Sequence, residues 1–529
     1  MAVHFTFILV LFLVLIFALR YIYNVLTKPG LKVSTILNKD KPILTLSASI
    51  LVEKLQNGEL RSEQIVQTYI ARIKAVNGFI NVVVQQRFEA ALDEAREVDK
   101  RLENLSESER KAVFNAKVLY GAPFTCKEAF GFKGFAQTGG LVRRRNTIAS
   151  KNAVVVQKIL DAGAILLAAT NVSELCMWWE STNCVYGRSL NPYNTEHIVG
   201  GSSGGEAAII AAAGSVIGIG SDIGGSIRMP AFFNGVFGHK PSPRMVSNLG
   251  QFPVNCTEAA ELMLSTGPIC RYAVDLTLML KVMSSDADFK KRLESNVDID
   301  KLKFYSIDNC GLLASKVSPE LLKAQEKVCQ FFGKKIGASV TKLELPLIKH
   351  AIFIWLTKMS VMGGPSFGEM LFGVSNRATG LLSCWEVLKW CVGQSDYTFP
   401  AIRLAAFESL KNVLPKSLEQ NSLRNGENLR VEIEEILGED GVLLFPSHPS
   451  TALRHNVPIF KPNNFIYTGI FNALHLPVTQ VPLGLDSNGL PLGIQVVAAR
   501  NNDHLTLAVA EALEREFGGW VPPSLDAIT

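Results

Sequence analysis

GGSSGGEAAIIAAAGSVIGIGSDIGGSIRMPAFFNGVFGHKP, residues 200–241, decides the fold of this chain. Two clusters of serine and glycine flank a predicted helix at 205–213 and a predicted strand at 216–221. A helix followed by a strand brings both glycine-rich loops to the same edge of a sheet. Because glycine permits positive φ and close backbone approach, residues 223–226 can direct consecutive N–H groups at one oxyanion.

Short apolar runs alternate with helical stretches on both sides of this segment. Strands are predicted at 124–126 and 165–168 around a helix at 153–162, and strand patterns return at 442–445 and 492–497. This alternation predicts an α/β fold, which we interpret as a single large domain with a central mixed twisted β-sheet flanked by helices. The predicted divisions are an anchor at 1–28 and a domain at 29–529, with a catalytic core at about 118–270, a helical insertion at about 273–437 and closing strands at about 440–515.

Composition excludes several classes of function. The 529 residues are 48% hydrophobic, which is enough to bury a large core. The net charge of +5 comes from 53 basic and 48 acidic residues spread along the chain, so no nucleic-acid partner is expected. Nine cysteines form no CxxC pair and no Cys/His ligand spacing. We therefore expect neither a disulfide framework nor a metal, and no cofactor.

The N-terminus carries a long apolar segment. Residues 5–19 are apolar except for Thr6, and 21–26 extend the run beyond Arg20. A bilayer-spanning helix needs about 20 such residues. A cleaved signal peptide would require a basic region before the run and a small-x-small site after it, and the sequence has neither. The segment therefore predicts a transmembrane helix preceding the α/β domain and a single-pass membrane location, endomembrane or lipid droplet, with the orientation left open.

The glycine-rich clusters have three other interpretations. A phosphate loop would need Lys-Ser/Thr after GGSSGG or a GxGxxG, and both are missing. GSSGG also fits the G-x-S-x-G nucleophile elbow with Ser203 at its centre. His239, His448 and His475 are available for that mechanism, but the glycine-rich loop lies downstream of Ser203 and not upstream. Both clusters are also compatible with ordinary tight turns.

Residues 200–241 as a whole resemble the signature of the amidase signature family. APFTCKEAF at 122–130 is similar to the strand that carries the catalytic lysine of that family. Within the family, SELCMWWES at 173–181, FPSHP at 445–449 and the apolar N-terminus most resemble the type 2 fatty-acid amide hydrolases. The resemblance extends from about residue 46 to 515 and includes TNVSEL (170–175), NPYN (191–194), NALHLPVTQVPLG (472–484) and GLPLGIQVV (489–497).

The resemblance implies a site, residue by residue. Lys127 matches the family's buried lysine, Ser202 the serine in a cis peptide, and Ser226 the nucleophile. The other implied residues are the oxyanion-hole N–H groups of Ile223, Gly224, Gly225 and Ser226, and the supporting side chains Ser203, Asp222 and Arg228.

These residues imply a serine hydrolase mechanism. Burial lowers the pKa of a lysine, so a neutral Lys127 can take the Ser226 proton through Ser202, and water then hydrolyses the acyl-enzyme. We expect a membrane-anchored enzyme that cleaves long-chain fatty acid amides to fatty acid and amine. Cys176, Met177 and Trp178 are candidates for its substrate channel.

Other functions and partners stay open at this stage. The alternatives are an amidase for small or peptide amides, the tRNA amidotransferase subunit, an α/β-hydrolase esterase using Ser203, and a binding protein that has lost turnover. The expected partners are a lipid-like amide and, through the N-terminal helix, a membrane. The sequence is also compatible with a homodimer.

Overall fold

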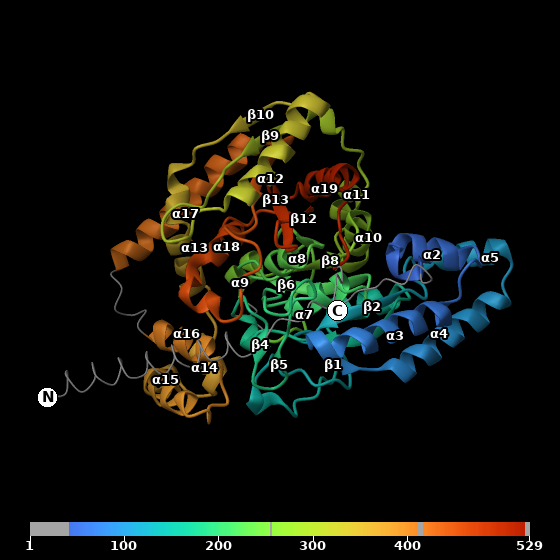
Figure 1. The fold of residues 1–529 in the computed structure, drawn as a ribbon, viewed down its shortest axis with the longest axis horizontal. Coiled ribbons are helices and arrows are strands. Elements are labelled where there is room, and N and C mark those ends of the chain that lie inside the picture. Colours follow the sequence, from blue (N-terminus) through green and yellow to red (C-terminus); the bar gives the residue numbers. More distant parts are fainter. Residues whose placement is uncertain (1–41, 254–256, 410–415, 524–529) are drawn as a thin grey trace.

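The computed structural model describes residues 42–253, 257–409 and 416–523. Its centre is an eleven-stranded sheet in the order β1-β3-β2-β6-β8-β7-β12-β13-β11-β9-β10, beside which β4 and β5 form a separate hairpin (Figure 1). The strands are β1 (Val83–Gln86), β2 (Pro123–Lys127), β3 (Ile165–Thr170), β4 (Thr182–Asn183), β5 (Gly187–Arg188), β6 (Ile217–Asp222), β7 (Phe237–Lys240), β8 (Ser265–Cys270), β9 (Lys303–Ser306), β10 (Val340–Lys342), β11 (Gly441–Pro446), β12 (Val478–Leu485) and β13 (Pro491–Ala498).

The sheet is mixed, which confirms the predicted α/β architecture. β2 runs parallel to both β3 and β6, whereas β6 is antiparallel to β8. On the other side, β11 is parallel to β9 and antiparallel to β13. β9 and β10 come from residues 273–437, where the sequence predicted a helical insertion. The division of the chain into a core, an insertion and closing strands stays a prediction.

Helices surround the sheet. In Figure 1, α2 to α5 lie at one end of the molecule, and α14 to α16 form a group of their own near the other end. The helices are α2 (Ala48–Gln56), α3 (Ser62–Ile80), α4 (Phe88–Glu103), α5 (Glu107–Ala116), α6 (Val154–Asp161), α7 (Gly204–Ala211), α8 (Arg228–Phe233), α9 (Glu258–Met263), α10 (Ala273–Met283), α11 (Ala287–Leu293), α12 (Pro319–Gln330), α13 (Ala351–Ser360), α14 (Phe367–Phe372), α15 (Asn376–Cys391), α16 (Phe399–Ser409), α17 (Lys416–Leu437), α18 (Ile466–Ala473) and α19 (Asp503–Phe517).

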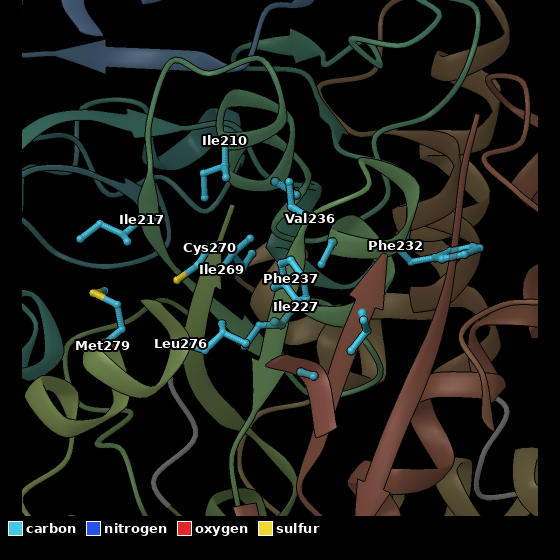
Figure 2. Close-up of a cluster of buried hydrophobic side chains, with 14 of the residues drawn as sticks. Ile210, Ile217, Ile227, Phe232, Val236, Phe237, Ile269, Cys270, Leu276 and Met279 are labelled. Atoms are coloured by element: carbon cyan, nitrogen blue, oxygen red, sulfur yellow. The ribbon is translucent and has the colours of Figure 1, made fainter. Parts of the chain in front are cut away.

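The main core lies on the central strands. Every residue of β2, β3, β6, β8 and β11 is buried, as expected for strands covered on both faces. Figure 2 shows part of this core, with Ile227, Phe237 and Ile269 close together at its centre. Ile227 directly follows Ser226 and is fully buried, so the loop that carries Ser226 is anchored in the core.

A smaller apolar cluster holds the α14–α16 group on the rest of the molecule. Leu141 and Leu175, which belong to the sheet side, pack with residues of α14 and α16. Leu175 directly precedes Cys176, so this cluster also holds the segment that contains the predicted channel residues. The buried members from the helices are Phe367, Leu371, Ala401 and Ala405.

The predicted transmembrane helix and the single-pass membrane location are wrong for the described fold. Within residues 42–253, 257–409 and 416–523, no helix has both the length and the hydropathy to cross a bilayer. The two longest helices there, α3 with 19 and α17 with 22 residues, carry charged side chains along their length. The predicted anchor at 1–28 lies outside the described residues.

Candidate active site

Two neighbouring parallel strands bring the predicted site residues together. Lys127 is the last residue of β2, and Ser221 and Asp222 are the last two residues of β6. β2 and β6 pair in parallel, with Thr125 beside Gly218, so both strands end at the same edge of the sheet. The carboxyl ends of parallel strands are where α/β proteins commonly place ligand sites.

Lys127 is fully buried at this edge of the sheet. Its Nζ donates hydrogen bonds to Ser202 Oγ at 2.7 Å and to Ser221 Oγ at 2.9 Å. Burial lowers the pKa of Lys127, although the nearby Cys176 and Asp222 oppose this shift. The neutral amine, which can accept a proton, is therefore favoured relative to an exposed lysine.

The two serines of the first cluster have different surroundings. Ser202 follows a cis peptide bond from Gly201 and contacts Lys127. The Ser203 hydroxyl instead donates to the Ser221 carbonyl at 3.4 Å, and its N–H donates to the Ser226 carbonyl at 3.2 Å. Among the described residues, no hydrogen bond joins the Ser226 hydroxyl to Ser202. The structure thus joins Lys127 to Ser202 by a direct hydrogen bond and joins the backbone of Ser226 to that of Ser203, the residue after Ser202.

The histidines that a nucleophile elbow would need have other partners. His239 bonds to Asp503 at 3.1 Å and to Thr479 at 2.8 Å, in the interior. His448 Nδ1 lies 2.8 Å from the Ser450 carbonyl. In the described part of the chain, no hydrogen bond links His239, His448 or His475 to Ser203. This geometry offers Ser203 no general base.

The loop after β6 presents several unpaired N–H groups. Of the four N–H groups that the resemblance implied, that of Gly225 donates to Asp222 Oδ1 at 2.7 Å. Those of Ile223, Gly224 and Ser226 make no hydrogen bond to any described residue. Gly225 has φ +120°, and an added Cβ would lie 1.9 Å from Thr468 Oγ1, so only glycine fits there. Unpaired N–H groups on one glycine-rich loop are a common means by which a backbone binds an anion.

A fully buried ion pair holds this loop. Arg228 Nε and Nη2 donate to the two carboxylate oxygens of Asp222 at 3.0 and 2.9 Å, and Asp222 Oδ2 also accepts from the Ile227 N–H at 3.0 Å. Burial alone would raise the pKa of Asp222, but the charge and hydrogen bonds of Arg228 hold it well below its usual range. The remaining donors of Arg228 bind Thr468 O at 2.8 Å, Gln495 Oε1 at 2.9 Å and Asn472 Oδ1 at 2.6 Å.

The three predicted channel residues, Cys176, Met177 and Trp178, lie in the segment that follows β3. Burial raises the pKa of the Cys176 thiol and the charge of the nearby Lys127 opposes this shift, so Cys176 lies close to the buried lysine. Met177 is half-buried and packs against both apolar clusters. Trp178 is also half-buried, with the Arg403 guanidinium 5.6 Å from its ring centroid. Their role as a channel stays a prediction.

Sequence reasoning did not identify two polar groups that support the site. Ser221 is the second acceptor for Lys127, and it stands directly before the DIGGS sequence that marks the loop. Glu206, on α7, is fully buried and accepts hydrogen bonds from Thr125 and from Thr170. Burial raises the pKa of Glu206 to about 8. The only local sign of Glu206 is an acidic residue inside an otherwise apolar and small-residue helix.

Comparisons with known proteins give a family match and several relatives. Residues 64–507 match the family model described as Amidase. The chain is 49% identical to fatty-acid amide hydrolase 2 of Homo sapiens over 91% of both chains. It is 46% identical to fatty-acid amide hydrolase 2-A of Danio rerio over 92% of this chain and 91% of that one. A solved structure titled fatty acid amide hydrolase shares the fold, with a TM-score of 0.70 at 23% identity, covering 92% of this chain and 87% of that one.

Proposed function

Since the chain belongs to the amidase family and is a hydrolase acting on amides, we propose that it cleaves long-chain fatty acid amides with Ser226 as nucleophile, Ser202 as proton relay and Lys127 as base. The products are a free fatty acid and an amine. Small or peptide amides are the alternative substrates.

One contact carries the mechanistic part of this proposal. Lys127 Nζ lies 2.7 Å from Ser202 Oγ, and the Lys127 side chain is fully buried. A serine hydroxyl is a weak nucleophile at neutral pH, so it needs a base to accept its proton. Lys127, whose pKa is lowered by burial, fits that task, and Ser202 is bonded to Lys127 and directly precedes Ser203, whose N–H bonds to the Ser226 carbonyl.

The reaction then proceeds in two halves. Ser226 Oγ attacks the amide carbon while its proton passes to Ser202 and the Ser202 proton passes to Lys127. This transfer requires the Ser226 hydroxyl to come within hydrogen-bond distance of Ser202 when substrate is bound. The same path in reverse protonates the leaving nitrogen, so the C–N bond breaks and the amine departs as a neutral molecule. Water then attacks the acyl-enzyme and releases the fatty acid and Ser226.

The free N–H groups of Ile223, Gly224 and Ser226 support the tetrahedral intermediates. They lie on the loop that carries the nucleophile, and none of them has a partner among the described residues. Each such donor typically contributes about 3 to 4 kcal/mol to the stabilisation of the transition state. Gly225 is left out of this set because its N–H is bound to Asp222.

The long acyl chain is inferred from the relatives and from the apolar surroundings of the loop. Three relatives at 46–49% identity are named fatty-acid amide hydrolase 2, 2-A and 2-B. A Cβ added at Gly224 would lie 3.2 Å from the Trp355 ring and 3.5 Å from the Phe465 ring, so aromatic surface lies directly against the loop. Aromatic and aliphatic walls with few polar groups suit an acyl chain. The homodimer predicted from the sequence stays a prediction.

The experiment compares the wild type with Ser226→Ala, Ser203→Ala and Lys127→Ala. Each is treated with a fluorophosphonate probe and assayed on oleamide and on benzamide. Ser215→Ala is the matched control, since Ser215 is a buried serine whose hydroxyl bonds to the Ile217 carbonyl at 2.9 Å, just before β6 begins.

We expect labelling and oleamide hydrolysis to disappear in Ser226→Ala and to persist in Ser215→Ala. If Ser226→Ala kept labelling and hydrolysis while Ser203→Ala lost both, the nucleophile elbow would be supported and the assignment of Ser226 would be overturned. Faster turnover of benzamide than of oleamide by the wild type would refute the long-chain substrate while leaving the mechanism intact.

A further inference from the structure

We propose that Trp355 is a positioning residue for the reaction: its indole N–H holds the Ile223 carbonyl and thereby presents the Gly224 N–H of the same peptide to the oxyanion. This inference rests on the proposed function, because it takes Ser226 as the nucleophile. Trp355 lies on α13, more than a hundred residues away from the loop in sequence and outside the glycine-rich stretch at 200–241.

The contact is a direct one. Trp355 Nε1 donates to the Ile223 carbonyl oxygen at 3.0 Å, and the Trp355 side chain is only 8% exposed. In a trans peptide the C=O and N–H groups point in opposite directions. Because the carbonyl of this peptide is held on the side of α13, the Gly224 N–H is turned away from α13, and it makes no hydrogen bond to any described residue.

The other carbonyls of the loop also have donors. The Asp222 carbonyl accepts from Asn472 Nδ2 at 2.9 Å, and the Gly224 carbonyl accepts from Thr468 Oγ1 at 2.9 Å. The Gly225 carbonyl accepts from the Met229 N–H at 2.7 Å. The carbonyl of each residue from Asp222 to Gly225 therefore accepts a hydrogen bond, which restrains the orientation of its peptide. For the peptide between Ile223 and Gly224, the donor is Trp355 on α13.

Packing prevents the indole from turning away. The rings of Trp355 and Phe465 meet edge to face, with centroids 4.7 Å apart at an angle of 72°. Gly224 lies against both rings, and a Cβ at Gly469 would lie 3.3 Å from Trp355 Cδ1. The ring is therefore enclosed by the loop, Phe465 and α18. Without its N–H, the Ile223 carbonyl, in a half-buried residue, would lose this partner, and the peptide would be free to rotate.

A purely packing role for Trp355 is the competing explanation, and the two can be separated. Trp355→Phe removes the N–H and part of the ring. Replacement of Trp355 by 3-benzothienylalanine removes the N–H but keeps the ring volume. Trp520→Phe is the matched control, because Trp520 Nε1 also donates to a backbone carbonyl, that of Ala211 at 3.2 Å. Trp520 packs against Arg271, away from the loop.

The readout must report on the oxyanion. For each variant, kcat and KM for oleamide are measured, together with the inhibition constants of a long-chain trifluoromethyl ketone and of the corresponding alcohol. The ketone forms a tetrahedral adduct with an oxyanion, whereas the alcohol does not. Loss of one direct donor typically lowers kcat by about a hundredfold or more, so misalignment of one donor is expected to lower it about tenfold.

We expect both Trp355 variants to lower kcat about tenfold with KM unchanged, and to weaken the ketone about tenfold without changing the alcohol. Trp520→Phe should leave the ketone-to-alcohol ratio at the wild-type value. A wild-type ratio in the 3-benzothienylalanine variant would show that Trp355 acts by packing alone and would overturn the proposal, even if Trp355→Phe fails to fold. Continued hydrolysis by Ser226→Ala would refute the proposed function itself. If Ser226→Ala is inactive but both Trp355 variants keep the wild-type ketone-to-alcohol ratio, only this inference is refuted.

Discussion

Replacement of Asp222 by asparagine should destabilise the protein strongly, because it leaves the charge of Arg228 uncompensated in the interior. Both side chains are 0% exposed, and the two guanidinium–carboxylate hydrogen bonds are 2.9 and 3.0 Å long. Removing one partner of such a pair typically costs about 3 to 5 kcal/mol. Arg228 keeps neutral acceptors on Thr468, Gln495 and Asn472, so we place the loss of unfolding free energy near the lower end, at about 3 kcal/mol.

The assay is urea denaturation at pH 7.5, followed by tryptophan fluorescence. Asp93→Asn is the matched control, since its ion pair with Arg96 is exposed, at 73% and 50% of the two side chains, and such pairs contribute about 1 kcal/mol or less. The double variant Asp222→Asn with Arg228→Met should recover part of the loss, because it removes the unpaired charge. A loss below about 1 kcal/mol in Asp222→Asn would refute the reasoning, because it is what an exposed pair would give.

Three further predictions concern the pocket of Lys127. The value of kcat/KM should rise with pH through an ionisation below the ordinary lysine pKa of 10.5, because only the neutral amine accepts a proton. Lys127→Ala should abolish this rising limb of the pH–rate profile and lower kcat by about 10² to 10⁴. A wild-type profile without the limb would contradict the assignment of Lys127 as base. Ser221→Ala removes an acceptor of the protonated amine, so the limb should move to lower pH, and an upward shift would exclude this role. Burial raises the pKa of Glu206 to about 8, so the folded state keeps a proton that the unfolded chain releases above about pH 4.5, and stability falls as pH rises between these values. Glu206→Gln should flatten that fall by up to about 1.4 kcal/mol per pH unit in urea titrations from pH 5 to 8, and an unchanged slope would show that Glu206 is not protonated there.

The local sequence determined the elements on which the site is built. The strands predicted at 165–168 and 442–445 are observed at Ile165–Thr170 and Gly441–Pro446, and the helix predicted at 205–213 is observed at Gly204–Ala211. Such elements can be found from the sequence because apolar runs, glycine clusters and strand–helix alternation depend on neighbouring residues. The family followed from the length of the glycine-rich stretch.

Only the tertiary structure decided how these elements work together. The Asp222 carboxylate occupies the Gly225 N–H, and Trp355 binds the Ile223 carbonyl across 132 positions of sequence. β9 and β10 join the sheet from a segment whose sequence pattern is mostly helical. They do so because β9 pairs with β11, a strand far away in the sequence, and β10 pairs with β9. The sequence by itself therefore determined the fold family and the candidate residues, whereas the free N–H groups, the acceptors of Lys127 and the support of the loop arise from contacts between segments far apart in the chain, which no local pattern encodes.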